Sequence, residues 1–187
     1  INTNKKISEI NNLDPQTCYG RTKKMNEDII KDFANSYGLK YVFLRLFNVS
    51  GALNEINFNH GPDSNSTTAI ARAINLGRKK SKKKYLITRT GKSKRFIKTP
   101  VRDFTHVKDI ADAFFKSIIY LNKNKKSEIF NIGSGSDGIN VLDLIKKIKN
   151  ELGIKINFSI SDKMDDISYM VPDISKAKRV LKYKPLN

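Results

Sequence analysis

Near the start of the chain the spacing of apolar residues changes from a helical period to a continuous run, which predicts a helix followed by a strand. From 21 to 37 apolar residues recur every three or four positions, which is typical of an amphipathic helix. Gly38 follows, where a glycine in the left-handed conformation would end the helix. Residues 41–44 are then all apolar, as in a strand buried on both faces of a parallel sheet. Together these segments predict half of a βαβ unit.

The rest of the chain continues this alternation of periods. Patterns typical of strands occupy four segments, 85–88, 101–107, 128–132 and 154–160. Patterns typical of amphipathic helices occupy four others, 66–76, 110–121, 141–152 and 175–181. Asp109 and Asn140 each precede one of these helices, and we expect their side chains to cap the helix N-termini.

Composition narrows the class of protein. The 187 residues are 39% hydrophobic, which suits one domain or one domain plus part of another. No run of 18 apolar residues predicts a membrane span. The single cysteine, Cys18, cannot form an internal disulfide and fits a reducing, cytoplasmic compartment. His60 and His106 lack zinc-site spacing, so we expect no metal. The N-terminus has neither an initiator Met nor a signal-peptide core, which suggests a piece of a longer protein.

The net charge of +18 makes nucleic acid a candidate partner, because such a surface attracts polyanions. The lysines gather in separate runs at 78–84, 92–98 and 123–126, beside many asparagines. No strand face interleaves aromatic and basic residues. The pattern therefore favours solvated loops over a nucleic-acid surface.

Tyr19 and Lys23 form the first candidate for chemistry. They are four residues apart at the head of the first helix, so their side chains lie on one face. An ammonium beside a phenol favours the phenolate, and such a tyrosine can exchange a proton with a substrate hydroxyl near neutral pH. The same spacing also occurs in ordinary surface pairs, so the motif alone leaves both interpretations open.

A glycine-rich segment at 133–138 is the second candidate. It matches G-x-G-x-x-G between a predicted strand and a predicted helix, and Asp162 follows Gly138 by 24 residues. This is the pattern of a dinucleotide-binding loop. Against that, the expected cap Asn140 comes after the last glycine, whereas in a true fingerprint the helix begins inside the motif. Asn131 also stands where a buried strand end would prefer a small apolar residue. From the pattern alone, a cofactor loop and a polar turn both remain possible.

Four ordered segments carry a resemblance to a known family. They are 19–23, 44–52, 101–113 and 130–135. Together they resemble the UDP-glucose 4-epimerases, which are extended short-chain dehydrogenases/reductases. The Arg-Asp-aromatic-x-His-Val block within 101–107 is the most specific of them.

The resemblance covers nearly the whole chain and implies its organisation. The fold would be α/β, comprising the C-terminal part of a Rossmann-type parallel-sheet domain and a smaller α/β substrate-binding region. Residues 1–52 would belong to the NAD-binding Rossmann domain, with 101–121 returning to it, and 53–187 mainly to the UDP-sugar-binding region. The NAD fingerprint and the catalytic Ser/Thr would precede Ile1, and the glycine-rich segment would lie in the substrate region.

The resemblance also implies roles for residues near the reacting sugar. Tyr19 would be the base that takes the proton of the sugar 4-hydroxyl. Lys23 would hold the nicotinamide ribose, and Phe47 would lie near the nicotinamide.

A second set of roles concerns the nucleotide. Asn48, at the carboxyl end of the predicted strand, and Asn65 would contact the diphosphate. Arg102 would pair with a phosphate oxygen through its planar fork. Asp166 would bind the uridine ribose.

Four positions depart from the family pattern. Leu46 replaces the tyrosine before Phe-Asn, and Arg89 replaces the aromatic residue that covers the uracil. Lys163 stands where the family has a phosphate-binding arginine, and a lysine cannot make a bidentate contact. Met170 occupies the position that limits the size of the sugar.

The function implied is NAD-dependent epimerisation at C4 of a UDP-hexose, interconverting UDP-galactose and UDP-glucose in galactose metabolism. The alternatives are another NAD-dependent nucleotide-sugar dehydratase, decarboxylase or reductase and, from a different class, a basic nucleic-acid-binding module. The resemblance implies a cytoplasmic homodimer formed through the Tyr19–Lys23 helix, without membrane or nucleic-acid partners. The chain alone is expected to be inactive, because the pyrophosphate loop and first strands would lie outside it.

Overall fold

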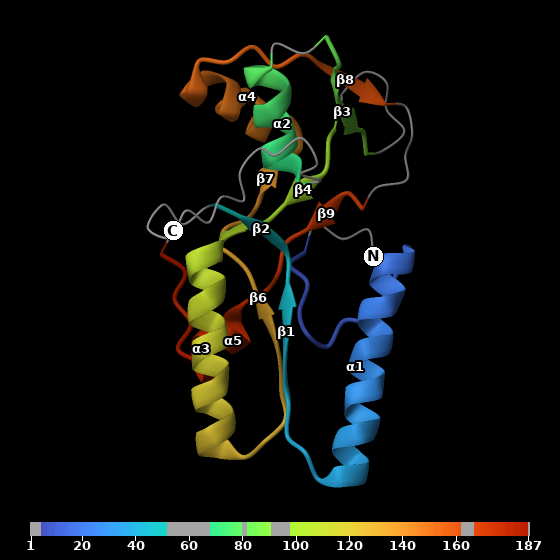
Figure 1. Ribbon diagram of the computed structural model, residues 1–187, viewed down its shortest axis with the longest axis vertical. Coiled ribbons are helices and arrows are strands. Elements are labelled where there is room, and N and C mark those ends of the chain that lie inside the picture. Colours follow the sequence, from blue (N-terminus) through green and yellow to red (C-terminus); the bar gives the residue numbers. More distant parts are fainter. Residues whose placement is uncertain (1–4, 52–67, 80–81, 91–97, 162–166, 187) are drawn as a thin grey trace.

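The computed structural model describes residues 5–51, 68–79, 82–90, 98–161 and 167–186, and they form an α/β fold as predicted (Figure 1). The helices are α1 (Cys18–Tyr37), α2 (Ala69–Arg78), α3 (Val107–Asn124), α4 (Val141–Leu152) and α5 (Ser175–Val180). The strands are β1 (Val42–Leu46), β2 (Asn48–Ser50), β3 (Tyr85–Thr88), β4 (Val101–Arg102), β5 (Phe104–His106), β6 (Glu128–Ile132), β7 (Ile139–Asn140), β8 (Phe158–Ser161) and β9 (Tyr169–Met170).

Strand β1 lies between helices on its two faces (Figure 1). It pairs in parallel with β6, with Leu44 opposite Phe130. Val42 and Leu44 pack against a core built largely from α3, α5 and β6. The alternate residues Phe43 and Arg45 meet α1 instead. Helices on both faces of a parallel pair are the arrangement that the apolar run predicted.

Two hydrophobic cores hold the described fold together. The first joins β6, α3, α5 and the chain after α5 through Ile110, Ala113, Phe130, Ile132, Ile174, Ala177, Leu181 and Tyr183. The second joins α2, α4, β3 and the chain before β8 through Ala73, Tyr85, Ile87, Leu144, Ile145, Ile148 and Ile156. Both are built from apolar helix faces and strands, so the two periods in the sequence correspond to actual packing surfaces.

The helix ends test the sequence predictions closely. Gly38 ends α1 with φ 68°, in the predicted left-handed conformation. Asn140 caps α4, where its side chain accepts a hydrogen bond from Leu142 N. The predicted cap Asp109 is wrong. Helix α3 begins three residues earlier than predicted, because the His106 ring nitrogen accepts from Lys108 N at 3.2 Å, and Asp109 lies buried in the first turn.

Strand β1 is less buried than its sequence predicted. Its residues are half-buried, and Leu46 at its end is 38% exposed. Within the described residues β1 pairs only with β6, so its other edge carries no neighbouring strand there. A strand with one covered edge cannot reach the burial of a central strand.

The glycine-rich segment wraps around a buried carboxylate. Asp103 is fully buried and accepts hydrogen bonds from the amide and the hydroxyl of Ser134 and from Thr105 Oγ1. Ser136 N donates to Ser134 Oγ, and Gly138 N donates to Ser136 Oγ. A Cβ on Gly133 would lie 2.2 Å from Pro172 Cγ, so only glycine fits there.

These contacts decide between the two interpretations of G-x-G-x-x-G. Amides that a dinucleotide loop would turn toward a pyrophosphate are bonded here to side chains of the protein. The N-terminus of α4 is similarly capped, since Leu142 N meets both Asn140 Oδ1 and Thr99 Oγ1. The segment is a polar turn that joins the strands.

The buried Tyr183 hydroxyl should make the free energy of unfolding fall at alkaline pH. This fully buried hydroxyl donates to Gly133 O at 3.0 Å. Burial, together with the nearby carboxylates of Asp109, Asp103 and Asp112, raises its pKa well above the ordinary value. The unfolded chain therefore loses this proton first, and the stabilisation present below about pH 10 is lost as pH rises, at up to about 1.4 kcal/mol per unit.

Replacement Tyr183→Phe should lower the free energy of unfolding of the full-length gene product at neutral pH by about 1–2 kcal/mol. It should also flatten the decline above about pH 10. Urea unfolding between pH 7 and 11 measures both effects. Tyr37→Phe, at an exposed tyrosine, is the matched control. An unchanged alkaline slope in Tyr183→Phe would contradict the assignment.

Replacement Asp103→Ala removes the acceptor shared by Ser134 and Thr105. We expect a loss of about 2–4 kcal/mol in the free energy of unfolding, because buried donors are left without a partner. Urea denaturation checks the value. Asp137→Ala is the control, since that carboxylate bonds Lys6 on the surface and is 94% exposed. Equal effects of the two changes would show that the buried contacts are not stabilising.

Candidate functional site

The predicted pair Tyr19 and Lys23 forms at the start of α1. Thr17 Oγ1 accepts from Gly20 N at 3.0 Å and begins the helix one residue before Tyr19. Lys23 Nζ lies 5.4 Å from the centroid of the Tyr19 ring. The tyrosine is 73% exposed in the described fold. A cation therefore stands beside a phenol that remains open to a ligand.

A stripe of side chains at four-residue steps runs down α1 from this pair. After Tyr19 and Lys23 come Glu27, which is paired with Arg45, and Lys31, whose Nζ lies 5.8 Å from the centroid of the Phe43 ring. Four helical residues rise about 6 Å, and two strand residues rise about 6.6 Å. Because α1 and β1 run in opposite directions, each four-residue step back along α1 corresponds to a two-residue step forward along β1.

Three predicted substrate residues lie on three short strands, β2, β4 and β9. Asn48 begins β2, which pairs in parallel with β5, and Asn48 Nδ2 donates to Asp103 O at 2.8 Å. Arg102 ends β4, directly before Asp103, and its Nη1 donates to Val101 O at 2.9 Å. Met170 in β9 is the Cα partner of Arg102. The fold thus brings Asn48, Arg102 and Met170 together.

The other predicted residues are spread more widely. Phe47 is half-buried between β1 and β2. Arg89 is half-buried after β3, the strand that contributes Tyr85 and Ile87 to the second core. Asn65, Lys163 and Asp166 lie outside the described residues.

Sequence reasoning missed three residues that organise this region: Glu27, Arg45 and Asp103. Arg45 is the clearest omission, because a charged residue in an otherwise apolar strand must find a partner. Glu27 continues the four-residue stripe from Tyr19 and Lys23, which was a second signal. Asp103 stood inside the recognised Arg-Asp-aromatic block, but nothing in the sequence indicated that its carboxylate is buried.

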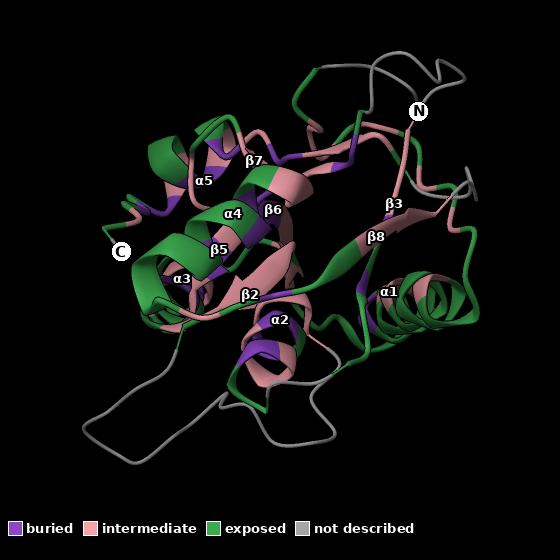
Figure 2. Ribbon diagram, turned by 90° about the horizontal axis from the view of Figure 1, so that it is seen from above, coloured by how far each residue is buried: buried purple, intermediate pink, exposed green. Residues whose placement is uncertain are grey.

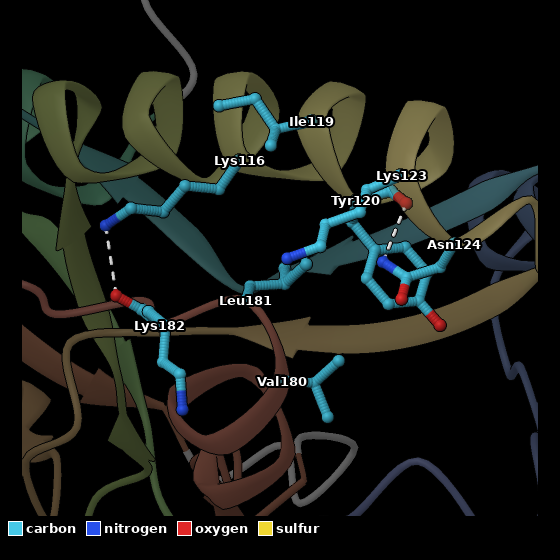
Figure 3. A pocket seen from close by; sticks show the side chains of 8 residues that line it. All are labelled: Lys116, Ile119, Tyr120, Lys123, Asn124, Val180, Leu181 and Lys182. Carbon is cyan, nitrogen blue, oxygen red and sulfur yellow. Dashed lines mark hydrogen bonds between the residues drawn. The ribbon is translucent and has the colours of Figure 1, made fainter.

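A separate cleft of about 390 Å³ lies between α3 and the end of α5 (Figure 3). Ile119, Val180 and Leu181 form its apolar part. The Lys116 ammonium at its edge bonds Asp112 and donates to Lys182 O. None of the predicted site residues lines this cleft, so it is not part of the candidate site.

Two further searches cover the described residues. No helix there combines the length and the apolar character that crossing a membrane requires. No group of three or more His, Cys, Asp and Glu side chains there is arranged to hold a metal ion.

Solved structures of UDP-glucose 4-epimerases share this arrangement. The chain is 28% identical to a UDP-glucose-4-epimerase from Stenotrophomonas maltophila, solved with bound NAD and formylated UDP-arabinopyranose. The TM-score is 0.77, and the match covers 97% of this chain and 54% of that one. For a Brucella ovis UDP-glucose 4-epimerase in complex with NAD, the TM-score is 0.87 at 24% identity, over 100% of this chain and 56% of that one, which supports the fold.

The sequence comparisons agree. The chain is 35% identical over 179 residues to a UDP-glucose 4-epimerase from Rhizobium meliloti, covering 91% of this chain and 51% of that protein. The chain spans about half the length of the curated relatives it matches. A model of the NAD dependent epimerase/dehydratase family matches residues 2–133. Because that match extends over more than half of the sequence, the chain belongs to the NAD dependent epimerase/dehydratase family.

Proposed function

We propose that the full-length protein is a NAD-dependent UDP-hexose 4-epimerase that interconverts UDP-galactose and UDP-glucose. The observation that carries the proposal is the Lys23 ammonium beside the exposed Tyr19 phenol, on a helix paired with the strand that leads to Phe47 and Asn48. The similarity to named UDP-glucose 4-epimerases supports the same reaction. A role in galactose metabolism and a cytoplasmic homodimer are part of this proposal.

Tyr19 and Lys23 would perform the proton chemistry. The Tyr19 oxygen would take the proton from the sugar 4-hydroxyl and later return it, as one group acting as base and then as acid. The Lys23 charge would stabilise the phenolate while the proton is on the sugar. Bound NAD would supply the hydride acceptor and donor for C4.

The described residues fit one end of NAD. The exposed Tyr19 and the ammonium of Lys23 leave an open polar surface for the nicotinamide ribose, and Phe47, directly after β1, offers a half-buried aromatic side chain. The glycine-rich turn does not fit the pyrophosphate, because its amides bond Asp103 and the serines. We therefore assign no pyrophosphate contact to that turn.

Residues of β2, β4 and β9 would hold the UDP part of the substrate. Asn48 has two N–H groups, of which one donates to Asp103 O, so the other can serve a phosphate oxygen. Arg102 donates to Val101 O through Nη1, and its planar guanidinium has the fork geometry that suits a phosphate oxygen. Met170 lies opposite Arg102, where its bulk would limit the size of the sugar.

The first test is turnover by the full-length gene product supplied with UDP-galactose and NAD. We expect UDP-glucose to form without a change in mass, and Tyr19→Phe to lower kcat by about 10²–10⁴-fold through loss of acid–base catalysis. Tyr37→Phe, an exposed tyrosine of the same helix, should leave kcat unchanged. No conversion by the unaltered protein would refute the proposal, and a product of altered mass would favour a dehydratase or decarboxylase.

The second test addresses the nucleotide site. Arg102→Lys keeps the charge but loses the bidentate geometry, so KM for UDP-galactose should rise about tenfold, with kcat within about twofold. Lys108→Arg, at an exposed position two residues beyond β5, is the conservative control. A fall in kcat at unchanged KM would contradict a phosphate-binding role for Arg102.

A further inference from the structure

Helix α1 is anchored by few apolar contacts in the described fold. Of its residues only Ala34 is buried. Beyond Tyr19, its large apolar side chains are 44–71% exposed, and Figure 2 shows the helix mostly in the colour of exposed residues; they are Met25, Ile29, Ile30, Phe33 and Tyr37. Within the described residues, apolar packing alone therefore does not fix the height of the helix along β1.

One ion pair joins α1 to β1 with defined geometry. Arg45 Nε lies 2.8 Å from Glu27 Oε1, and Arg45 Nη2 lies 2.7 Å from Glu27 Oε2. The side chains are 18% and 14% exposed, respectively. Hydrogen bonding to Glu27 raises the pKa of Arg45 above its ordinary value. A two-bond fork holds both the distance and the orientation between its partners, which a single contact cannot do.

The same guanidinium holds the segment that leads into α1. Arg45 Nη1 donates to Glu9 O at 3.1 Å, and Glu9 Oε1 accepts from Asn131 N at 2.8 Å. Arg45 therefore links the helix, its own strand and the segment before Tyr19. The connection extends through Glu9 to β6, the parallel partner of β1.

We propose that Arg45 and Glu27 are positioning residues, whose bidentate ion pair sets the height of Tyr19 and Lys23 against β1 and the residues Phe47 and Asn48 that follow it. This inference rests on the proposed function. It follows from the shared rise of the two elements. Lys31 meets Phe43 and Glu27 meets Arg45, so the next step along α1 brings Lys23 to the height of the C-terminal end of β1, where Phe47 follows.

The cost of losing the pair is kinetic. A shift of α1 by one residue moves its side chains by about 1.5 Å along the axis and about 100° around it. A misplacement of about 1 Å in a reacting group can lower the rate about 100-fold. Substrate affinity should change little, because Asn48 and Arg102 are held through Asp103 and β4 rather than through α1.

The experiment compares Glu27→Gln and Arg45→Lys with Asp28→Asn in the full-length gene product. Arg45→Lys keeps the charge and removes the fork. Asp28→Asn makes the same charge change as Glu27→Gln one residue along the helix, at a carboxylate that faces Lys31 and is 57% exposed. The measurements are kcat and KM with UDP-galactose and NAD, and amide hydrogen exchange of peptides from α1 and α4.

We expect Glu27→Gln to lower kcat about 10–100-fold and to leave KM within about twofold. Arg45→Lys should give a smaller loss, and Asp28→Asn should match the unaltered protein. Exchange should accelerate in α1 and stay constant in α4. Unchanged kcat with unchanged exchange would overturn the inference. So would faster exchange in α1 and α4 alike with kcat and KM both altered, because that result describes general destabilisation.

The two proposals fail separately. If the unaltered protein does not epimerise UDP-galactose, the proposed function is wrong and the exchange data still judge the ion pair. Selective acceleration in α1 would then support the positioning of the helix, and its absence would refute it.

Discussion

The arrangement of the strands depends on the hydrogen bonds that the buried residue Asp103 accepts. Its side chain holds Ser134 and Thr105, and its backbone carbonyl accepts from Asn48. One residue thereby joins β4, β5, β2 and the glycine-rich turn. A buried carboxylate is costly unless its oxygens are satisfied, and here three neutral donors satisfy them. The candidate substrate residues follow from this geometry, because Arg102 precedes Asp103 in the chain and Met170 pairs beside it.

Much of the fold could be predicted from the sequence because its elements bury one face each. The strand at 128–132 and the helix at 141–152 have their predicted bounds, and Gly38 and Asn140 end or begin helices as expected. The start of α3 was missed because two polar residues three positions apart, His106 and Asp109, could each cap it, and it is the His106 side chain that accepts the amide hydrogen bond. The exposure of β1 was missed because a run of apolar residues shows only that a strand can be buried. Within the described residues only one edge of β1 is covered by another strand.

In the candidate site, too, contacts between residues close in sequence could be predicted, and contacts between distant segments could not. Tyr19 and Lys23 are local, so spacing alone brought them together, and their contact is confirmed. The glycines of 133–138 could belong to a cofactor loop or to a polar turn, because a glycine shows only that a Cβ is not tolerated at its position. At Gly133 the cause is the Pro172 ring and not a phosphate. The Arg45–Glu27 pair depends on how helix and strand align after the turn, which no periodicity encodes.

The pairing of β1 with β6 also constrains how the molecule reaches its native state. Tyr41 N donates to Ser127 Oγ, 86 residues along the chain, and Asn48 reaches Asp103 across 55. Parallel strands cannot close as hairpins, so loop closure must precede the first favourable contacts of each pair, and such topologies fold slowly. During synthesis β1 emerges long before its partner does. The apolar side chains of Val42 and Leu44 must therefore stay uncovered until β6 is made, which makes this interval the stage at which the nascent chain is most exposed to aggregation.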